Sequence, residues 1–349
     1  MAPRLVALDV PGGPGFVEQL QAIWNAGDAA FPVDRRLPDA AKTALCDAMR
    51  VGDPVEAGDA LVVATSGSTG TPKGVVLTHD AVAASAEATS QRLMVTPDDH
   101  WLACLPLSHV GGLSVVTRAL HAHTGLTVLP GFDAAAVDAS TATLVSLVST
   151  ALTRIDSARW RNIVLGGSRP PADRPANCVT TYGMTETGSG VVYDGVPLAG
   201  VEVRIDDGQI LLRGPMLLRS YRNGSTPLDA AGWLATGDLG GWDDSGRLRV
   251  DGRAGDLIIT GGENVWPEAV EAVLQTHPTV ADVLVRGADD SEWGQLVEAV
   301  VVADVGCDVA LDDLRAHVKE THPAFMAPKR LTLVDALPRT SLGKLQRKQ

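Results

Sequence analysis

The segment from Thr65 to Gly74 contains the residue types that bind anions. It reads Thr-Ser-Gly-Ser-Thr-Gly-Thr-Pro-Lys-Gly and so combines five hydroxyl side chains, three glycines and Lys73. Glycines let backbone N–H groups approach an anion closely, hydroxyls add donors, and the lysine adds a positive charge. The segment is not the GxxxxGK[ST] loop, because Pro72 precedes the lysine and Gly74 follows it. These features favour an anion-binding loop over a flexible turn.

Further segments carry charged or polar residues suited to chemistry. They are Pro106-Leu107-Ser108-His109, Tyr182-Gly183-Met184-Thr185-Glu186, Thr236-Gly237-Asp238, Gly252-Arg253, Gly261-Gly262-Glu263-Asn264 and Pro338-Arg339-Thr340-Ser341-Leu342-Gly343-Lys344. Taken singly, Glu186 could be a surface carboxylate, Asp238 a turn residue and Lys344 a solvated charge near the C-terminus. Their order along one chain is more specific than any one of them.

In that order, and together with the Thr65 loop, these segments resemble the motifs of the adenylate-forming family, which comprises acyl-CoA synthetases, peptide-synthetase adenylation domains and luciferases. The resemblance extends from residue 60 to residue 345. It implies that a carboxylic acid is first joined to AMP with release of pyrophosphate. A thiol, usually that of CoA, then displaces AMP to give a thioester. Two anions meet in the first step, so positive charge and aimed donors are needed there.

The resemblance also implies which residues contact ATP. The loop would hold the β- and γ-phosphates, and Glu186 with Thr65 would hold Mg²⁺, a hard cation suited to oxygen ligands. Thr185 would contact the α-phosphate, and Tyr182 would lie against adenine. The loop residues concerned are Thr65, Ser66, Gly67, Ser68, Thr69, Gly70 and Lys73.

Other ATP-contacting residues come from later in the chain. Asp238 accepts hydrogen bonds when ionised and matches the paired ribose hydroxyls. Arg253 would reach the ribose and phosphate region. Lys344 would bridge the carboxylate and α-phosphate oxygens during adenylation. The glycine pair Gly166 and Gly167 belongs to a glycine-rich segment of the nucleotide site.

The acid is expected to bind near His109, which the family places at the acyl pocket, although a packed or capping histidine is the alternative. The run Leu105–Ser114 lacks the Asp of amino-acid-activating relatives. With Arg118, it most resembles the 2-succinylbenzoate–CoA ligases of menaquinone synthesis. Arg118 or Arg169 could bind a second carboxylate, or either could form a structural ion pair. The expected substrate contacts are His109, Gly112, Leu113, Arg118 and Ser168. Within the glycine-rich segment, Ser168 and Arg169 depart from the usual small residues.

The C-terminal part of the chain is expected to serve the thioester step. In this family a small domain rotates about a hinge, which falls on Gly255, and brings either Lys344 to ATP or the Gly261-Gly262 loop to a pantetheine tunnel. Aromatic stacking and a positive charge for the CoA nucleotide are expected from Trp293, Phe325 and Lys329, although the aromatic residues could instead be core residues. Ala327 replaces an arginine found in some relatives.

The elements that must position these residues follow from hydrophobic patterning. Short apolar runs predict strands at 60–64, 101–105, 125–129, 143–148, 161–165 and 177–181, with a helix at 81–93. This alternation predicts a layered α/β core. After residue 195 the pattern predicts a β-rich part with strands at 201–205, 209–213 and 247–250. Beyond it we expect strands at 280–286, 297–303 and 331–334 and helices at 267–275 and 311–321.

The predicted fold is therefore α/β, with two domains. Residues 1–253 form a large layered domain that binds ATP and the acid, and residues 254–349 form a small mobile α+β domain that carries the adenylation lysine. The anion-binding loop begins at Thr65, where most relatives have a much longer preceding stretch. We therefore expect a shortened N-terminal subdomain.

Composition restricts the remaining function classes. The 29 basic and 42 acidic residues give a net charge of −13, which disfavours nonspecific binding to nucleic acid or anionic lipid. No segment predicts a membrane span or a signal peptide, and four scattered cysteines favour a cytoplasmic protein with reduced thiols. The family resemblance allows a homodimer, but no feature marks an interface.

The expected activity is an acid–thiol ligase that uses ATP, Mg²⁺ and CoA, with 2-succinylbenzoate as the favoured acid. A ligase for another aryl or aliphatic acid and a stand-alone enzyme that loads a separate carrier protein remain as alternatives. The chain ends shortly after Lys344, so we expect no fused carrier domain. A catalytically silent relative is disfavoured because Glu186 and Lys344 are both present.

Overall fold

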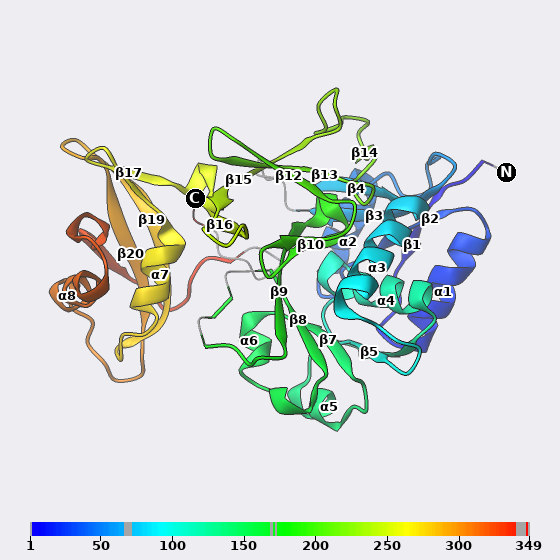
Figure 1. Cartoon of the computed structure of the whole chain (residues 1–349), viewed down its shortest axis with the longest axis horizontal. Coiled ribbons are helices and arrows are strands. Elements are labelled where there is room, and N and C mark those ends of the chain that lie inside the picture. The colour runs from blue at the N-terminus through cyan, green and yellow to red at the C-terminus, as the bar shows by residue number, and fades with distance from the viewer. Residues whose placement is uncertain (1, 66–71, 168–169, 172, 340–346, 348–349) are drawn as a thin grey trace. The chain divides into compact units, whose positions relative to one another are not determined.

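The computed structural model describes residues 2–65, 72–167, 170–171, 173–339 and 347. Its contacts divide the chain into two compact units (Figure 1). The first unit comprises Met1–Arg204, Leu211–Ala235 and Trp242–Leu248, and the second comprises Ile205–Ile210, Thr236–Gly241 and Arg249–Gln349. Because the units interleave between residues 205 and 248, they do not test the domain boundary predicted after Arg253, which stays a prediction.

A seven-stranded sheet forms one layer of the first unit. Five parallel strands supply most of it, and two strands extend its edge in the antiparallel direction. Leu144–Leu147 is buried along its whole length, as expected for a parallel strand covered on both faces. The strands, in sheet order, are β11 (Val196–Pro197), β10 (Ser189–Tyr193), β9 (Cys178–Met184), β8 (Asn162–Leu165), β7 (Leu144–Leu147), β5 (His100–Ala103) and β6 (Gly125–Val128). The strands predicted in this region are confirmed.

A five-stranded sheet forms a second layer of this unit. Its order is β1 (Leu5–Leu8), β2 (Ala29–Pro32), β3 (Asp59–Thr65), β4 (Lys73–Thr78) and β14 (Ser220–Tyr221). β3 and β4 pair in the antiparallel direction, with Thr65 opposite Lys73. The sequence predicted a turn between a strand and a helix and missed β4. The anion-binding loop thus connects two strands of a hairpin.

Two helices lie between these sheets. α3 (His79–Leu93) contacts β3, β4 and β10, whereas α4 (Val110–Ala122) contacts β5, β6, β7 and β10. The Thr78 hydroxyl accepts a hydrogen bond from the Ala81 N–H and so caps α3, as side-chain oxygens do at helix N-termini. This arrangement confirms the predicted layered α/β core. The other helices of the unit are α1 (Pro14–Asn25), α2 (Asp39–Ala48), α5 (Ala134–Ala139), α6 (Ser149–Leu152) and the 3-10 turns η1 (Ser157–Arg159) and η2 (Thr185–Thr187).

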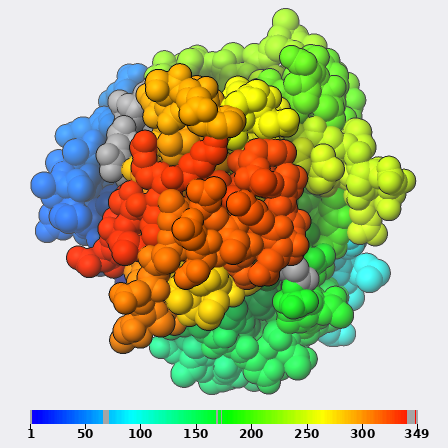
Figure 2. All heavy atoms as spheres, turned by 90° about the vertical axis from the view of Figure 1, so that its left-hand side faces the viewer, coloured from blue at the N-terminus to red at the C-terminus, as the bar shows by residue number. Residues whose placement is uncertain are grey.

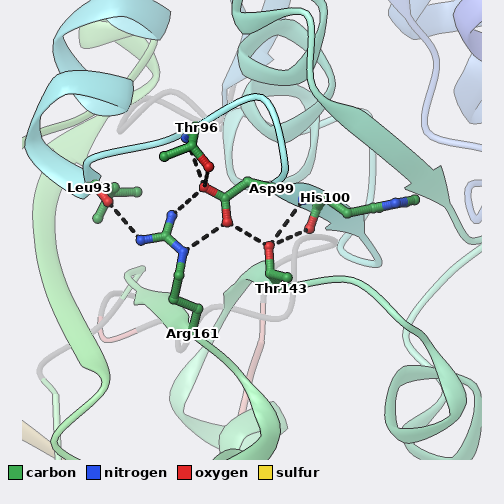
Figure 3. Close-up of polar contacts among 6 residues, drawn as sticks. All are labelled: Leu93, Thr96, Asp99, His100, Thr143 and Arg161. Carbon is green, nitrogen blue, oxygen red and sulfur yellow. Dashed lines mark hydrogen bonds and ion pairs between the residues drawn. The ribbon is translucent and has the colours of Figure 1, made fainter.

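A buried carboxylate links the amino ends of β5, β7 and β8 (Figure 3). Asp99 is 4% exposed and forms paired bonds of 2.8 and 2.7 Å with the Arg161 guanidinium. It also accepts hydrogen bonds from the Thr143 hydroxyl at 2.8 Å and the Thr96 N–H at 2.8 Å. Arg161 in turn donates to the carbonyl of Leu93, the last residue of α3. This network therefore has a structural role, since these strand ends are opposite the carboxyl ends that lead into the motif loops.

A four-stranded sheet follows in the chain. Its order is β12 (Glu202–Asp206), β13 (Gln209–Arg213), β15 (Leu234–Trp242) and β16 (Leu248–Arg253). Asp207 and Gly208 have φ angles of 47° and 77°, which match the two-residue turn that joins antiparallel strands. The predicted β-rich part of the chain is confirmed.

The second unit contains a small α+β module with its own apolar core, which Figure 2 draws in yellow to red. β19 (Val280–Asp290) and β20 (Gly294–Ala303) form its central antiparallel pair, and β21 (Arg330–Leu333) joins β20 in the parallel direction. Both helices and all three strands predicted here are confirmed. The remaining elements are η3 (Ala254–Asp256), β17 (Ile258–Thr260), β18 (Glu263–Val265), α7 (Pro267–Leu274), α8 (Leu311–Thr321) and η4 (Ala324–Met326).

Within the described ranges, no helix has both the length and the apolar character needed to cross a membrane.

Candidate functional site

The base of the anion-binding loop lies at the end of the β3–β4 hairpin. Thr65 and Lys73 face each other at its last register position, and the loop residues Ser66, Gly67, Ser68, Thr69 and Gly70 lie outside the described residues. Gly74 follows Lys73 where no side chain fits, because a Cβ there would lie 2.7 Å from Met49 Sδ and 2.9 Å from Arg222 Cβ. At this end of the motif, Lys73 therefore supplies a positive charge, and the packing requires glycine at position 74.

Glu186 lies in η2, directly after the carboxyl end of β9. Its Oε1 accepts a 2.9 Å hydrogen bond from the Tyr221 hydroxyl, and the Lys73 ammonium lies 4.9 Å from the centroid of the Tyr221 ring. Burial and the negative charge of Glu186 raise the pKa of Tyr221 well above its ordinary value. The phenol is consequently a proton donor at neutral pH, and it links the two charges predicted to handle phosphate and metal.

Tyr182 and Thr185 accompany Glu186 at this end of β9, and both are partly buried. Gly183 between them cannot be replaced without movement, because a Cβ would lie 2.2 Å from the Ser189 carbonyl oxygen on β10. The close approach of β10 therefore holds the Tyr182–Glu186 segment in place. The roles of Tyr182 at adenine and Thr185 at the α-phosphate stay predictions.

The residues near Glu186 fit a magnesium ion. Carboxylate and hydroxyl oxygens suit Mg²⁺, which usually takes one or two protein carboxylates and completes its shell with water and substrate phosphates. Within the part of the chain that the structure describes, no cluster of three or more His, Cys, Asp or Glu residues could hold a metal by itself. A single carboxylate beside a hairpin predicted to bind phosphate is the pattern expected for a metal that arrives with a nucleotide.

His109 contacts a pair of residues from the N-terminal part of the first unit. Its Nε2 lies 3.1 Å from Arg36 Nη2, and Arg36 forms 2.8 and 2.6 Å bonds with Asp34. A guanidinium can only donate, so His109 Nε2 faces a donor in Arg36, and the same nitrogen lies 3.7 Å from Asp34 Oδ2. Although burial raises the pKa of Asp34, the bonds and charge of Arg36 hold it below its ordinary value. His109 is thus oriented by an ion pair that the sequence analysis did not identify.

Arg118 is enclosed within the first unit, with 2% of its surface exposed. Its guanidinium donates to the Ser189 hydroxyl and, at 3.4 Å, to the Ser146 hydroxyl, and it lies over the Trp101 ring. Nε is buried without a hydrogen-bond partner. No carboxylate of the described residues forms an ion pair with it, so the alternative of a structural ion pair for Arg118 receives no support there.

The other described residues predicted at the acid, and the two glycines predicted at the nucleotide, have packing roles. A Cβ on Gly112 would lie 2.4 Å from the Leu105 carbonyl oxygen, and Leu113 is 1% exposed. Gly166 lies against Thr181, where a Cβ would be 2.6 Å from Oγ1, and Gly167 has a φ of 87° that favours glycine. Their contacts with ligands stay predictions, and Ser168 and Arg169 lie outside the described residues.

In the second unit, Asp238 and Arg253 lie together. Asp238 on β15 is 6% exposed, and its Oδ1 is 2.7 Å from Arg253 Nε at the end of β16. The Thr236 hydroxyl donates to the Ile210 carbonyl and accepts from the Asp238 N–H, while the Thr236 carbonyl accepts from Arg253. The structure therefore joins two of the residues predicted at the ribose.

Three residues predicted for CoA also meet in the second unit. Trp293 is 41% exposed, and the Lys329 ammonium lies 3.1 Å from its ring centroid. Gly261 has a φ of 59°, and a Cβ there would lie 2.7 Å from the Trp293 ring. Phe325 packs against the apolar core that includes the buried Ala327. This contact agrees with the alternative prediction of Phe325 as a core residue.

The remaining predicted residues are Gly262, Gly255 and Lys344. Gly262 has a φ of 86°, as a loop glycine does, and Gly255 lies in η3. Lys344 lies outside the described residues. Its role in adenylation and that of Gly255 as a hinge stay predictions.

Sequence reasoning missed Tyr221, Asp34 and Arg36. Each belongs to no motif and reaches the site from a distant part of the chain, since Tyr221 is on an edge strand and Asp34 follows β2. No local pattern marks such residues, because their partners lie far away in sequence.

Comparison with known proteins finds families and relatives that match this chain. The family model of AMP-binding enzymes matches residues 42–222, and the model of the AMP-binding enzyme C-terminal domain matches residues 269–344. Among curated proteins, the probable 2-succinylbenzoate–CoA ligase of Mycobacterium tuberculosis (strain CDC 1551 / Oshkosh) is 39% identical over 373 aligned residues. This alignment covers 98% of this chain and 96% of the relative.

Solved structures of a related enzyme have the same fold as this chain. The o-succinylbenzoate CoA synthetase from Bacillus subtilis, in complex with the acyl-adenylate intermediate OSB-AMP, superimposes with a TM-score of 0.90. It is 28% identical, and the match covers 99% of this chain and 87% of that one. The same enzyme in complex with ATP and magnesium ion gives a TM-score of 0.86 at 27% identity, with 98% and 87% coverage.

Proposed function

This chain belongs to the family of AMP-binding enzymes, and from this premise we propose that it is an ATP-dependent acid–CoA ligase whose acid is 2-succinylbenzoate. The observation that carries the ligase proposal is the convergence of Lys73 and Glu186 on Tyr221 at the base of the predicted phosphate loop. The relatives named for this reaction support the choice of acid.

In the proposed first step, a carboxylate oxygen of the acid attacks the α-phosphorus of ATP. The bond from this phosphorus to pyrophosphate breaks as the acyl-AMP forms. Lys73 and the loop hold the β- and γ-phosphates, Thr185 donates to the α-phosphate, and Lys344 stabilises the charge that develops between the two anions. Glu186 and Thr65 would hold Mg²⁺, which screens the phosphate charge when bound.

In the proposed second step, the sulfur of CoA attacks the acyl carbon, and AMP leaves with the electron pair of the broken C–O bond. Trp293 and Lys329 bind the nucleotide end of CoA, supported by their mutual contact. Asp238 and Arg253 hold the ribose and phosphate of the adenylate, supported by the ion pair that orders both side chains. His109, oriented by its contact with Arg36, borders the acyl pocket.

The buried guanidinium of Arg118 supports a dicarboxylic acid. A buried charge without a countercharge is costly, and a bound carboxylate lowers that cost. We therefore propose that Arg118 favours an acid with a second carboxylate. The positive charge of the guanidinium would attract that carboxylate, and the Ser146 and Ser189 hydroxyls would lie between the two groups. An aryl or aliphatic acid with a single carboxylate would lack this interaction.

The test is ATP–pyrophosphate exchange with a panel of acids, together with detection of CoA thioesters by mass spectrometry. The panel includes 2-succinylbenzoate and its analogue without the ring carboxylate. We expect exchange and thioester with the dicarboxylate, and an Arg118→Met loss of about 10- to 100-fold for that acid alone. Arg118→Lys is the matched control that keeps the charge. Exchange without thioester would favour a carrier-loading enzyme, and absence of exchange with every acid would overturn the proposal.

The proposal also covers partners and location. We propose a cytoplasmic homodimer that acts on small molecules without nucleic acid or membrane. The net charge of −13 supports the absence of nucleic-acid and membrane partners, and the free thiols of Cys46, Cys104, Cys178 and Cys307 support the cytoplasmic location. The dimer rests on the family resemblance alone. Sedimentation analysis of the purified protein tests the dimer, and a monomer at all concentrations would contradict it.

A further inference from the structure

Tyr221 contacts both charged residues that the proposed function assigns to phosphate and metal. Its hydroxyl donates to Glu186 Oε1 at 2.9 Å, and its ring lies below the Lys73 ammonium at 4.9 Å. A hydrogen bond to a carboxylate is charge-assisted, and an ammonium over an aromatic face is attracted by the ring quadrupole. The hydroxyl of Tyr221 thus interacts with the negative charge of Glu186, and its ring interacts with the positive charge of Lys73.

The backbone around Tyr221 is held rigidly. Tyr221 pairs with Val75 of β4, and the N–H of Arg222 donates to the Gly74 carbonyl at 2.7 Å. Arg219 lies two residues before Tyr221. Its guanidinium forms two 2.9 Å bonds with Asp59, which is 2% exposed.

Arg222 adds a second anchor. Its guanidinium donates to the carbonyls of Met49, Arg50 and Pro54, which lie at and after the end of α2. Two arginines therefore fix the short strand β14 from both sides of Tyr221. The position of the phenol follows from the fold and does not depend on a bound ligand.

Glu186 is joined to the same strand. Its carbonyl oxygen accepts a 2.8 Å hydrogen bond from the Leu218 N–H, three residues before Tyr221. The backbone bond and the side-chain bond together tie η2 to the segment that leads into β14. The Glu186 carboxylate keeps a second oxygen for a metal while Tyr221 bonds the first.

Tyr221 also separates the two charges. Lysine and glutamate side chains that lie close together ordinarily pair, and such a pair neutralises both groups. No ion pair joins these two described residues, and each of them contacts Tyr221. The ammonium consequently stays available for a phosphate, and the carboxylate stays available for a cation.

We propose that Tyr221 is a positioning residue that orients the metal-binding carboxylate of Glu186 and keeps the Lys73 ammonium apart from it. What Glu186 and Lys73 bind rests on the proposed function, whereas the contacts among the three residues do not. Partners that orient a metal-binding side chain typically change metal affinity or activity by about 10- to 100-fold when removed.

Two variants separate the two contacts. Tyr221→Phe keeps the ring below Lys73 and removes the hydroxyl, whereas Tyr221→Leu removes both. Tyr193→Phe is the matched control, because it deletes a tyrosine hydroxyl that contacts Thr89 in the core of the same unit. Calorimetry measures ATP binding with and without Mg²⁺, and electron paramagnetic resonance measures Mn²⁺ binding in the presence of ATP.

We expect Tyr221→Phe to weaken Mn²⁺ binding about tenfold and to leave metal-free ATP binding unchanged. Tyr221→Leu should also weaken metal-free ATP binding, because Lys73 becomes free to pair with Glu186. In a Glu186→Gln background the Tyr221→Phe effect should disappear, since the carboxylate is gone.

Wild-type levels of metal binding in both Tyr221 variants would overturn the inference while leaving the ligase proposal intact. The inference would also be overturned if the effects of Tyr221→Phe and Glu186→Gln on Mn²⁺ binding were fully additive, because the effects of substitutions at coupled residues do not add. If the wild-type protein bound neither ATP nor metal, the proposed function and this inference would fall together.

Discussion

At the scale of single residues, two lysines of the C-terminal part of the chain have opposite expected roles. Lys329 lies over the exposed Trp293 ring, where a CoA nucleotide is proposed to stack. Lys344 belongs to the last motif and is proposed to act only on the adenylation transition state. Because the two half-reactions can be assayed separately, each lysine can be tested against the other.

Replacement of Lys344 by alanine should lower acyl-AMP formation by about 100-fold or more, as loss of a donor to developing charge does. Thioester formation from supplied acyl-AMP should be spared. Lys329→Ala should show the reverse pattern, with normal pyrophosphate exchange and a KM for CoA raised about tenfold. Equal loss of both steps in Lys344→Ala would contradict the assignment.

At the scale of elements, the Asp99 network joins the end of α3 to the starts of β5, β7 and β8 (Figure 3). Asp99 is buried, and Arg161 supplies the countercharge through two bonds. Removal of one partner from a buried pair leaves an uncompensated charge. We therefore expect substitutions in this network to change the stability of the protein and not its catalysis.

Arg161→Met should lower the free energy of unfolding by about 3 kcal/mol, whereas Arg161→Met combined with Asp99→Asn should recover part of the loss. Urea denaturation of the two variants and the wild type measures these differences. A double variant less stable than the single one would contradict the explanation.

The same network predicts an acid dependence. Burial raises the pKa of Asp99, but the bonds from Thr96, Arg161 and Thr143 outweigh it, so the pKa lies below its ordinary value. A lowered folded-state pKa stabilises the protein above the unfolded-state pKa, and the stabilisation is lost as the pH falls through the folded-state value. Wild type should therefore lose more stability than Asp99→Asn on acidification below about pH 4.

Hydrophobic patterning predicted the parallel strands and the elements of the C-terminal module because each is a local apolar run. β4 was missed because Lys73–Thr78 follows directly from a motif rich in turn-forming residues. The sequence analysis made no prediction for β1, α1, β2 and α2, which precede the first motif. Strand pairing across the β3–β4 hairpin depends on contacts that periodicity within one segment does not reveal.

At the scale of the whole molecule, the proposed reaction requires the segment after Arg253 to change its conformation between the two half-reactions. Gly255 is the predicted hinge and lies in η3, at the start of the continuous C-terminal stretch of the second unit. A hinge residue absorbs a large change in backbone angles. The net charge of −13 also means that positive charge for ATP and CoA must be concentrated on a few residues, such as Lys73, Arg253 and Lys329.

Gly255→Pro should slow thioester formation more than acyl-AMP formation, because proline restricts φ at the hinge. Gly255→Ala restricts the backbone less and is the matched control. Single-turnover measurement of the two half-reactions distinguishes the outcomes. Equal rates in the proline variant and the wild type would show that Gly255 is not the hinge.

The sequence by itself determined the type of chemistry, because each motif carries its reactive side chains within a few consecutive residues. Thr65–Lys73, Tyr182–Glu186 and Trp293 needed no structure to be singled out. Only the tertiary structure decided how those side chains are held. Tyr221, Arg36 and the buried Arg118 acquire their roles through packing between distant segments, and such contacts leave no periodic or local signature in a chain.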